Sequence, residues 1–169
     1  MGWQLYIRLS GMMFFEFAIW GAWAPVLAAR LLGPLKMSGK QTGWIYATLP
    51  LACIISPLLA GQLADQYVNT EWILAVAHLA GGLLLFVAGG KSSFRSLFLV
   101  MLFYSFCYGA TLPLVNAVMF HQLAERNLDI GAYSPAIFIW APIAWALVGY
   151  LLTGLRWVFK TGSQGRDCL

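Results

Sequence analysis

The chain has 169 residues, of which 61% are hydrophobic and only 9% are charged, with a formal net charge of +4. A soluble protein of this size could not bury so much apolar surface, and an ordinary soluble domain carries about 25% charged residues. The composition therefore excludes a soluble enzyme. Nucleic-acid binding is excluded as well, because the ten Lys and Arg residues are scattered singly rather than gathered into a basic stripe. We expect an integral, multi-pass membrane protein that lies in the lipid bilayer.

Five apolar segments are long enough to cross a bilayer as helices, which takes roughly 20 residues each. Four of them contain no Asp, Glu, Lys or Arg, and in the first the stretch Leu9–Ala29 is interrupted only by Glu16. The predicted spans are residues 9–31, 42–64, 72–90, 97–120 and 135–155. Because these runs are continuously apolar, membrane β-strands are disfavoured. The predicted fold class is an all-α, polytopic transmembrane helical bundle over residues 1–160, followed by a polar C-terminal tail at 161–169.

Helix-breaking residues are common inside these spans. A proline inside a helix frees a carbonyl group, which is tolerable in a membrane only where protein or a water-filled cavity meets it. This pattern is typical of helices that move or line a cavity. Six of the seven prolines lie in the spans or at their ends: Pro25, Pro50, Pro57, Pro113, Pro135 and Pro142.

Four tryptophans lie deep within the first and fifth spans, namely Trp20, Trp23, Trp140 and Trp145. A buried indole N–H needs a hydrogen-bond partner, so these rings should face protein or a polar cavity. A cavity with aromatic walls would suit a flat, ring-shaped solute. Simple helix packing explains the same four residues about equally well.

Two polar residues inside the spans are candidates for function. Glu16 is the only acidic residue within a span, and a carboxylate at that depth is costly unless it faces a cavity, pairs or stays protonated. Glu16 could therefore bind and release a coupling proton, or it could bond to a neighbouring helix. Asn116 has an amide to satisfy, so it either clasps two helices together, which we favour, or contacts a solute.

The segment Gly61-Gln62-Leu63-Ala64-Asp65, between the second and third spans, resembles the signature loop of the major facilitator superfamily. In that superfamily the glycine lets helices approach closely, and the aspartate caps or pairs at helix ends. The resemblance implies that Gly61 and Asp65 belong to a gating loop.

Further residues resemble one branch of that superfamily, the nucleoside:proton symporters, from about Leu9 to Tyr150. The resemblance implies proton-coupled symport of nucleosides or a similar small solute by alternating access, without enzymatic activity, cofactor or metal. It also implies a substrate pathway walled by Trp20, Asn116, Trp140 and Trp145, with Glu16 as the proton carrier. The residues that carry it, besides the signature segment, include Phe17 through Trp23, Gly43, Tyr46, Pro57, Trp72, His78, Ser105-Phe106, Tyr108, Thr111-Leu112, Asn116, Asp129 and Ile139-Trp140.

The chain departs from the family pattern in its fifth span. The family leads us to expect an Arg two residues before Trp140 and Gly-Thr directly after it. Phe138 and the pair Ala141-Pro142 occupy those positions, and Glu16 stands where the family tends to have Gln. The assignment of a nucleoside as the solute therefore depends on the family resemblance alone.

Superfamily members have twelve helices in two halves, whereas five spans are predicted here. We therefore expect a fragment that needs the missing second half to transport, in the cell's inner (plasma) membrane. The alternatives are a non-transporting scaffold or relic, and a half-size transporter that associates with a partner. The family orientation places the N-terminus and Asp65 in the cytoplasm. It leaves only two of the ten basic residues inside, against the positive-inside rule, so the orientation stays open.

Overall fold

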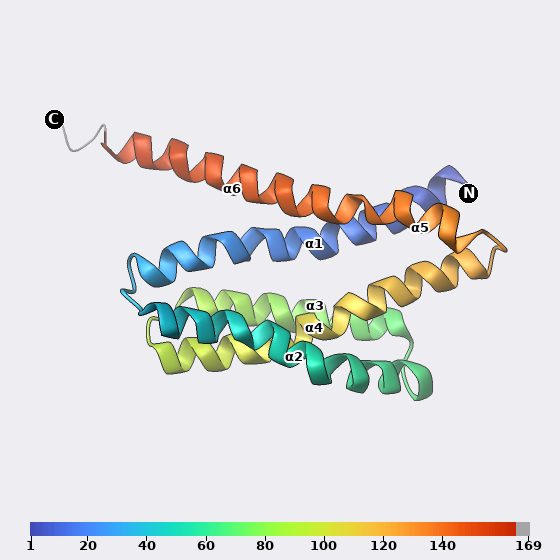
Figure 1. Cartoon of the computed structure of the whole chain (residues 1–169), viewed down its shortest axis with the longest axis horizontal. Helices are drawn as coiled ribbons and strands as arrows, with labels where there is room; N and C mark the ends of the chain where they lie inside the picture. Colours follow the sequence, from blue (N-terminus) through green and yellow to red (C-terminus); the bar gives the residue numbers. More distant parts are fainter. Residues whose placement is uncertain (165–169) are drawn as a thin grey trace. The chain divides into compact units, whose positions relative to one another are not determined.

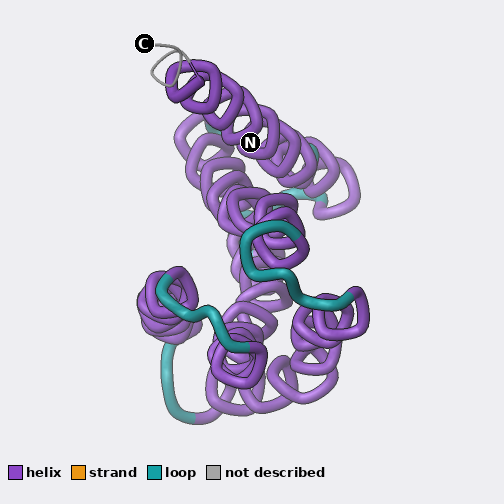
Figure 2. The backbone as a smooth tube through the Cα atoms, turned by 90° about the vertical axis from the view of Figure 1, so that its left-hand side faces the viewer, coloured by secondary structure: helices purple, strands orange, loops and turns teal. Residues whose placement is uncertain are grey.

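The computed structural model describes the backbone of residues 1–164 and the side chains of residues 1–155. This part of the chain is helical, without strands, and short loops connect its helices (Figures 1 and 2). Five regions are long and apolar enough to span a membrane, which confirms the predicted fold class. The helices are α1 (Trp3–Leu32), α2 (Gly39–Gln66), α3 (Thr70–Gly89), α4 (Phe94–Ala124), α5 (Ile130–Phe138) and α6 (Trp140–Gln164).

Most helices run a few residues past the predicted spans, because polar side chains satisfy the backbone groups of their first turns. At the start of α2, the Ser38 hydroxyl accepts from the Gln41 amide N–H at 3.2 Å, and the Gln41 side chain accepts from Ser38 N–H at 2.9 Å. The Ser93 hydroxyl likewise accepts from the backbone N–H of Ser96 at the start of α4. Such caps let a helix continue from the hydrocarbon into the polar interface.

The fifth span differs from the prediction because it consists of two helical segments, α5 and α6, which meet at Ile139. Pro142 has no N–H to offer the carbonyl of Phe138, and its ring crowds that group, so the regular hydrogen bonding is interrupted here. The two segments still form one candidate span, Ile130–Leu155. Residues 161–164 of the predicted tail continue α6, and residues 165–169 lie outside the described part.

The chain divides into two compact units. One of them, Ala28–Ile130, is built on α4, which packs against α2 and α3. In its core, the Thr48 hydroxyl donates to the Ile45 carbonyl at 2.7 Å and lies 2.9 Å from the Ser105 hydroxyl of α4. A hydroxyl has only one hydrogen, so Ser105 is the donor to Thr48. This buried pair fixes the register between α2 and α4.

Arg30, in the last turn of α1, belongs to this same unit and binds the C-terminal end of α3. Its guanidinium donates to the carbonyl oxygens of Ala88, Gly89 and Lys91 at 3.0, 2.6 and 2.8 Å. These carbonyl groups lie at and just beyond the end of α3, where a cation is favourable. Arg30 therefore ties the end of α1 to the end of α3.

The other unit, Met1–Leu27 with Gly131–Leu169, brings α1 against α5 and α6. The helices approach closely at Gly21, where an added Cβ would lie 2.7 Å from the carbonyl oxygen of Trp145. Only glycine permits such a near-backbone contact, as is common between membrane helices.

Many large apolar side chains are exposed on the helices rather than buried, including Ile54, Leu58, Leu83 and Phe86, the last with 85% of its surface exposed. In water this would be a severe aggregation hazard, whereas in a bilayer these side chains face lipid. The exposure pattern therefore agrees with the membrane assignment.

Candidate solute pathway

An aromatic groove opens between α1 and the α5–α6 pair. It has a volume of about 380 Å³ and is lined by Phe17, Trp20, Phe138, Ala141, Pro142 and Trp145. The indoles of Trp20 and Trp145 meet nearly edge to face, with centroids 6.4 Å apart at 66°, and Phe17 meets Phe138 at 5.9 Å and 75°. This geometry is preferred between aromatic rings, so it holds the walls in place.

The groove brings together Trp20 and Trp145, two of the residues predicted for the substrate pathway. It also contains all three positions at which the family resemblance leads us to expect Arg, Gly and Thr, here Phe138, Ala141 and Pro142. The lining is therefore apolar except for the two indole N–H groups. Such a surface can hold a flat ring by stacking, but it offers few hydrogen-bonding partners.

Phe17 is the wall residue that the sequence analysis did not assign to the pathway. Its ring lies 6.4 Å from that of Trp20, one helical turn further along α1. The spacing of three residues between two aromatic side chains on one helix was the available signal, because such residues share a face.

Trp140 does not line the aromatic groove, and its indole has the polar partner expected of a deep tryptophan. Its Nε1–H donates to the Tyr6 hydroxyl at 2.9 Å, and that hydroxyl donates to the carbonyl of Ala136 at 3.3 Å. Trp140 instead lines a second groove of about 270 Å³, here called the Ser10 groove. Its lining residues are Trp3, Tyr6, Ile7, Ser10, Gly11, Phe14 and Trp140.

Glu16 lies on α1 and is one of the most buried side chains, with 1% of its surface exposed. It precedes Trp20 by four residues, so the two share one face of α1 one turn apart. The side chain is therefore shielded from the outside, one helical turn from a wall residue of the aromatic groove. Its predicted role as the proton carrier remains a prediction.

Asn116, Gly61 and Asp65 belong to the other compact unit. The Asn116 side chain donates to the carbonyl of Leu112 in its own helix at 2.9 Å, so this bond is not the clasp between helices that we favoured. This local bond to the preceding turn occupies one N–H of the amide, so the interhelical clasp by the rest of the Asn116 side chain remains a prediction.

The segment predicted as a gating loop is helical, since α2 continues to Gln66 and includes both Gly61 and Asp65. A Cβ added to Gly61 would meet no atom within 4 Å, so this glycine does not mark a close approach within the described part of the chain. Asp65 is exposed in the last turn of α2.

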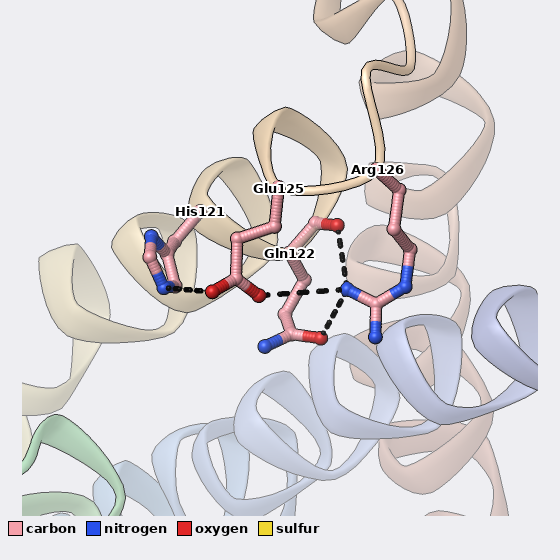
Figure 3. Close-up of polar contacts among 4 residues, drawn as sticks. All are labelled: His121, Gln122, Glu125 and Arg126. Carbon is pink, nitrogen blue, oxygen red and sulfur yellow. Dashed lines mark hydrogen bonds and ion pairs between the residues drawn. The ribbon is translucent and has the colours of Figure 1, made fainter.

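A polar groove of about 400 Å³ lies beside this end of α2, lined by Ala64, Asn69, Thr70, Glu71, Ala117, Val118 and His121. Figure 3 shows the neighbouring polar contacts at the end of α4. The His121 Nε2 lies 3.1 Å from Glu125, and Arg126 donates to the Gln122 carbonyl and side-chain oxygens at 2.9 and 2.8 Å. These exposed ion pairs contribute little to stability, and they form a solvated helix end rather than a chemical site.

Metal binding finds no support in the part of the chain that was searched, because no group of three or more His, Cys, Asp or Glu residues there could hold an ion.

Comparison with known proteins gives a consistent result. The family described as nucleoside H⁺ symporter matches residues 3–165 of the chain. The nucleoside permease NupG of Escherichia coli (strain K12) is 31% identical over 150 residues, which cover 89% of this chain and 36% of NupG. The xanthosine permease of the same organism is 29% identical over 168 residues, covering 95% of this chain and 40% of the permease.

Solved structures agree with these sequence matches. A crystal structure of the nucleoside transporter NupG superposes with a TM-score of 0.80 at 32% identity, covering 85% of this chain and 36% of that one. The structure of a NupG mutant gives a TM-score of 0.85, covering 89% and 38%. The chain thus spans little more than a third of the length of these relatives.

Proposed function

Since the chain belongs to the nucleoside H⁺ symporter family, we propose that it forms the N-terminal part of a proton-coupled transporter of nucleosides or similar small solutes. The relatives bear names such as nucleoside permease and xanthosine permease, which supports this substrate class. In such a transporter, two bundles rock around a site near the middle of the membrane. The five spans described here form part of one bundle, the remaining chain of the transporter supplies the other, and the assembly works in the cell's inner membrane.

The observation that carries this proposal is the aromatic groove. Its volume of about 380 Å³ and its four aromatic walls suit one flat heterocyclic ring. Stacking of a base on an aromatic side chain contributes about 1–3 kcal/mol and tolerates different bases. Because the lining is apolar, the groove holds the base, while the sugar hydroxyls find their partners in the second bundle.

Glu16 is the proton carrier in this proposal. Its carboxyl group is fully buried, one turn from Trp20 on the same helix. An ionised carboxylate is costly in an apolar interior, whereas the protonated acid is not, so proton binding and helix movement are coupled at this residue. Solute and proton then occupy neighbouring positions on α1.

Uptake of labelled uridine into membrane vesicles with an acidic exterior tests both roles. The chain is expressed alone and together with the part of NupG that follows the matched region. We expect uptake that depends on the proton gradient when both parts are present. It should fall about fivefold or more in Trp20→Ala, since one stacking wall is lost. The exposed Trp72→Ala, on α3, is the matched control.

Glu16→Gln separates proton coupling from solute binding. The amide keeps the shape of the carboxyl group but cannot carry a proton. We expect the variant to exchange labelled for unlabelled uridine across the membrane while losing accumulation against a gradient. Glu71→Gln, an exposed acid at the start of α3, should leave accumulation intact. Accumulation by Glu16→Gln at the unmodified level would overturn the proton role.

A further inference from the structure

We propose that Tyr6 is a positioning residue for the aromatic groove, because its hydroxyl joins the two helical segments that carry the walls of the groove. The inference rests on the proposed function, which makes this groove the solute site. Tyr6 itself is not one of the residues that line the aromatic groove. It acts through the break at Ile139, where α5 ends and α6 begins.

The Tyr6 hydroxyl forms one hydrogen bond on each side of this break. It donates to the carbonyl oxygen of Ala136 in α5 at 3.3 Å, and it accepts from the Nε1–H of Trp140 in α6 at 2.9 Å. In an uninterrupted helix, the regular backbone hydrogen bond joins the carbonyl of residue 136 to the N–H of residue 140. The hydroxyl from α1 thus bridges the same two positions from outside their helix.

The Tyr6 ring has a fixed place on α1. Trp3 stacks on it, with ring centroids 5.8 Å apart and planes at 28°. The indole N–H, the hydroxyl and the carbonyl oxygen also form a series of hydrogen bonds, in which each bond strengthens the next. α1 therefore carries one well-defined attachment point for both helical segments.

The break matters for the solute because the aromatic groove takes its walls from both segments. Phe138 is the last residue of α5, whereas Pro142 and Trp145 belong to α6. α6 is also held on α1 by the contact at Gly21, where an added Cβ would lie 2.7 Å from the Trp145 carbonyl oxygen. A change of angle at the break therefore moves α5, and Phe138 with it, relative to Trp145.

The Tyr6 bridge is the contact that selects one angle between the two segments. Pro142 interrupts the regular hydrogen bonding beside the break, and helices bend at proline. The ring contact between Phe17 and Phe138, at 5.9 Å and 75°, belongs to a broad range of favourable ring arrangements. Hydrogen bonds are directional and weaken steeply when they are bent. The Tyr6 hydroxyl therefore sets the angle, and with it the width of the aromatic groove.

Pulsed electron paramagnetic resonance on the purified chain in lipid nanodiscs measures this angle. Spin labels are attached through Ala132→Cys in α5 and Leu151→Cys in α6, both exposed positions, after the three natural cysteines are replaced by alanine. The labelled positions are about 28 Å apart along a continuous helix. We expect one narrow distance distribution in the unmodified background. It should broaden and shift in Tyr6→Phe, which keeps the ring but loses the bridge.

Two further variants accompany Tyr6→Phe. Tyr150→Phe removes an exposed hydroxyl from α6 and is the matched control, so it should leave the distance distribution unchanged. Trp140→Phe removes one of the two bonds of the bridge, and we expect a smaller broadening of the same kind. Because both changes act on one bridge, adding Trp140→Phe to Tyr6→Phe should broaden the distribution little further. Trp140→Phe also tests the bridge on its own if Tyr6→Phe does not fold.

Binding of labelled uridine to the same variants tests the consequence for the groove. In Tyr6→Phe the dissociation constant should rise about fivefold, the effect of one net hydrogen bond, although Tyr6 does not line the aromatic groove. A lowered thermal midpoint with unchanged distances in Tyr6→Phe and Trp140→Phe would give Tyr6 a purely structural role and overturn the inference.

Unchanged uridine affinity in a variant whose distance distribution broadens would overturn it as well. Absence of saturable uridine binding to the unmodified chain contradicts the proposed function, and the distances alone then decide whether the Tyr6 hydroxyl sets the angle between α5 and α6.

Discussion

Gly21→Ala tests the closest contact between α1 and α6. An added Cβ at this position would lie 2.7 Å from the Trp145 carbonyl oxygen, 2.9 Å from its Cα and 3.3 Å from its carbonyl carbon. All three atoms belong to the backbone, so no rotamer change can relieve the clash. The helices would have to separate by about 0.7 Å to restore an ordinary contact of 3.4 Å. Overpacking of this kind costs about 1–3 kcal/mol.

Gly149→Ala is the matched control, because it lies within α6 and a Cβ there would meet nothing within 4 Å. Alanine is favoured over glycine in a helix interior by up to about 1 kcal/mol. We therefore expect Gly149→Ala to be slightly stabilised and Gly21→Ala to be destabilised by about 1–2 kcal/mol.

Unfolding of the purified chain in mixed micelles with increasing SDS, followed by circular dichroism, measures the difference. If Gly21→Ala unfolds at the same SDS fraction as Gly149→Ala, the close packing of α1 on α6 is refuted.

Three further predictions concern the unit formed by α2, α3 and α4, each measured by the same SDS unfolding. Gly109→Ala should be destabilised by about 1 kcal/mol, because its Cβ would meet the Ser56 Oγ at 2.8 Å. The effect should be smaller than that of Gly21→Ala, since the Ser56 side chain can rotate away, and a larger loss of stability would contradict this reasoning. Thr48→Val should lower the free energy of unfolding by about 1–3 kcal/mol, because it leaves the Ser105 hydroxyl unpaired. Adding Ser105→Ala should restore part of that loss, and strictly additive effects of the two changes would argue against the pair. Arg30→Lys should lower the free energy of unfolding by about 2 kcal/mol, since an ammonium group cannot reach three carbonyl groups as the guanidinium does. An unchanged unfolding midpoint would contradict this role of Arg30 at the end of α3.

The sequence predicted the spans well because the bilayer imposes a simple physical rule. A backbone without water must bond internally, so long apolar runs have to be helices. The same rule made Glu16 conspicuous, and its burial agrees with the prediction that it sits within the apolar bundle. The contact of Trp20 with Trp145 agrees with the expectation that deep indoles face protein or a cavity, although the sequence did not predict which rings would meet.

Other features depended on contacts that no local pattern reveals. The Asn116 amide had a choice between a distant helix and a carbonyl of its own helix, and residue type alone does not decide between them. Trp140 was grouped with Trp145, yet the two lie five positions apart on α6, so their rings point to different faces of the helix and line different grooves. The helical state of Gly61 and Asp65 depends on where α2 stops, and helix ends are the least predictable part of an element.

The main addition of the structure is that the tryptophans predicted for the substrate pathway line two separate grooves, Trp20 and Trp145 in one and Trp140 in the other. It shows that the positions where this chain departs from the family pattern, Phe138, Ala141 and Pro142, all face one volume. The departures thus lie together on a single apolar surface. Their common location gives the departure a physical meaning that separate positions in the sequence did not have.

The central claim is that the aromatic groove binds the solute, and equilibrium dialysis of the purified chain with labelled uridine tests it most directly. We predict one saturable site, which is lost when Trp20 and Trp145 are both changed to alanine and is unchanged in Trp72→Ala. Absence of any saturable site, or the same number of sites in the double variant, would contradict the account.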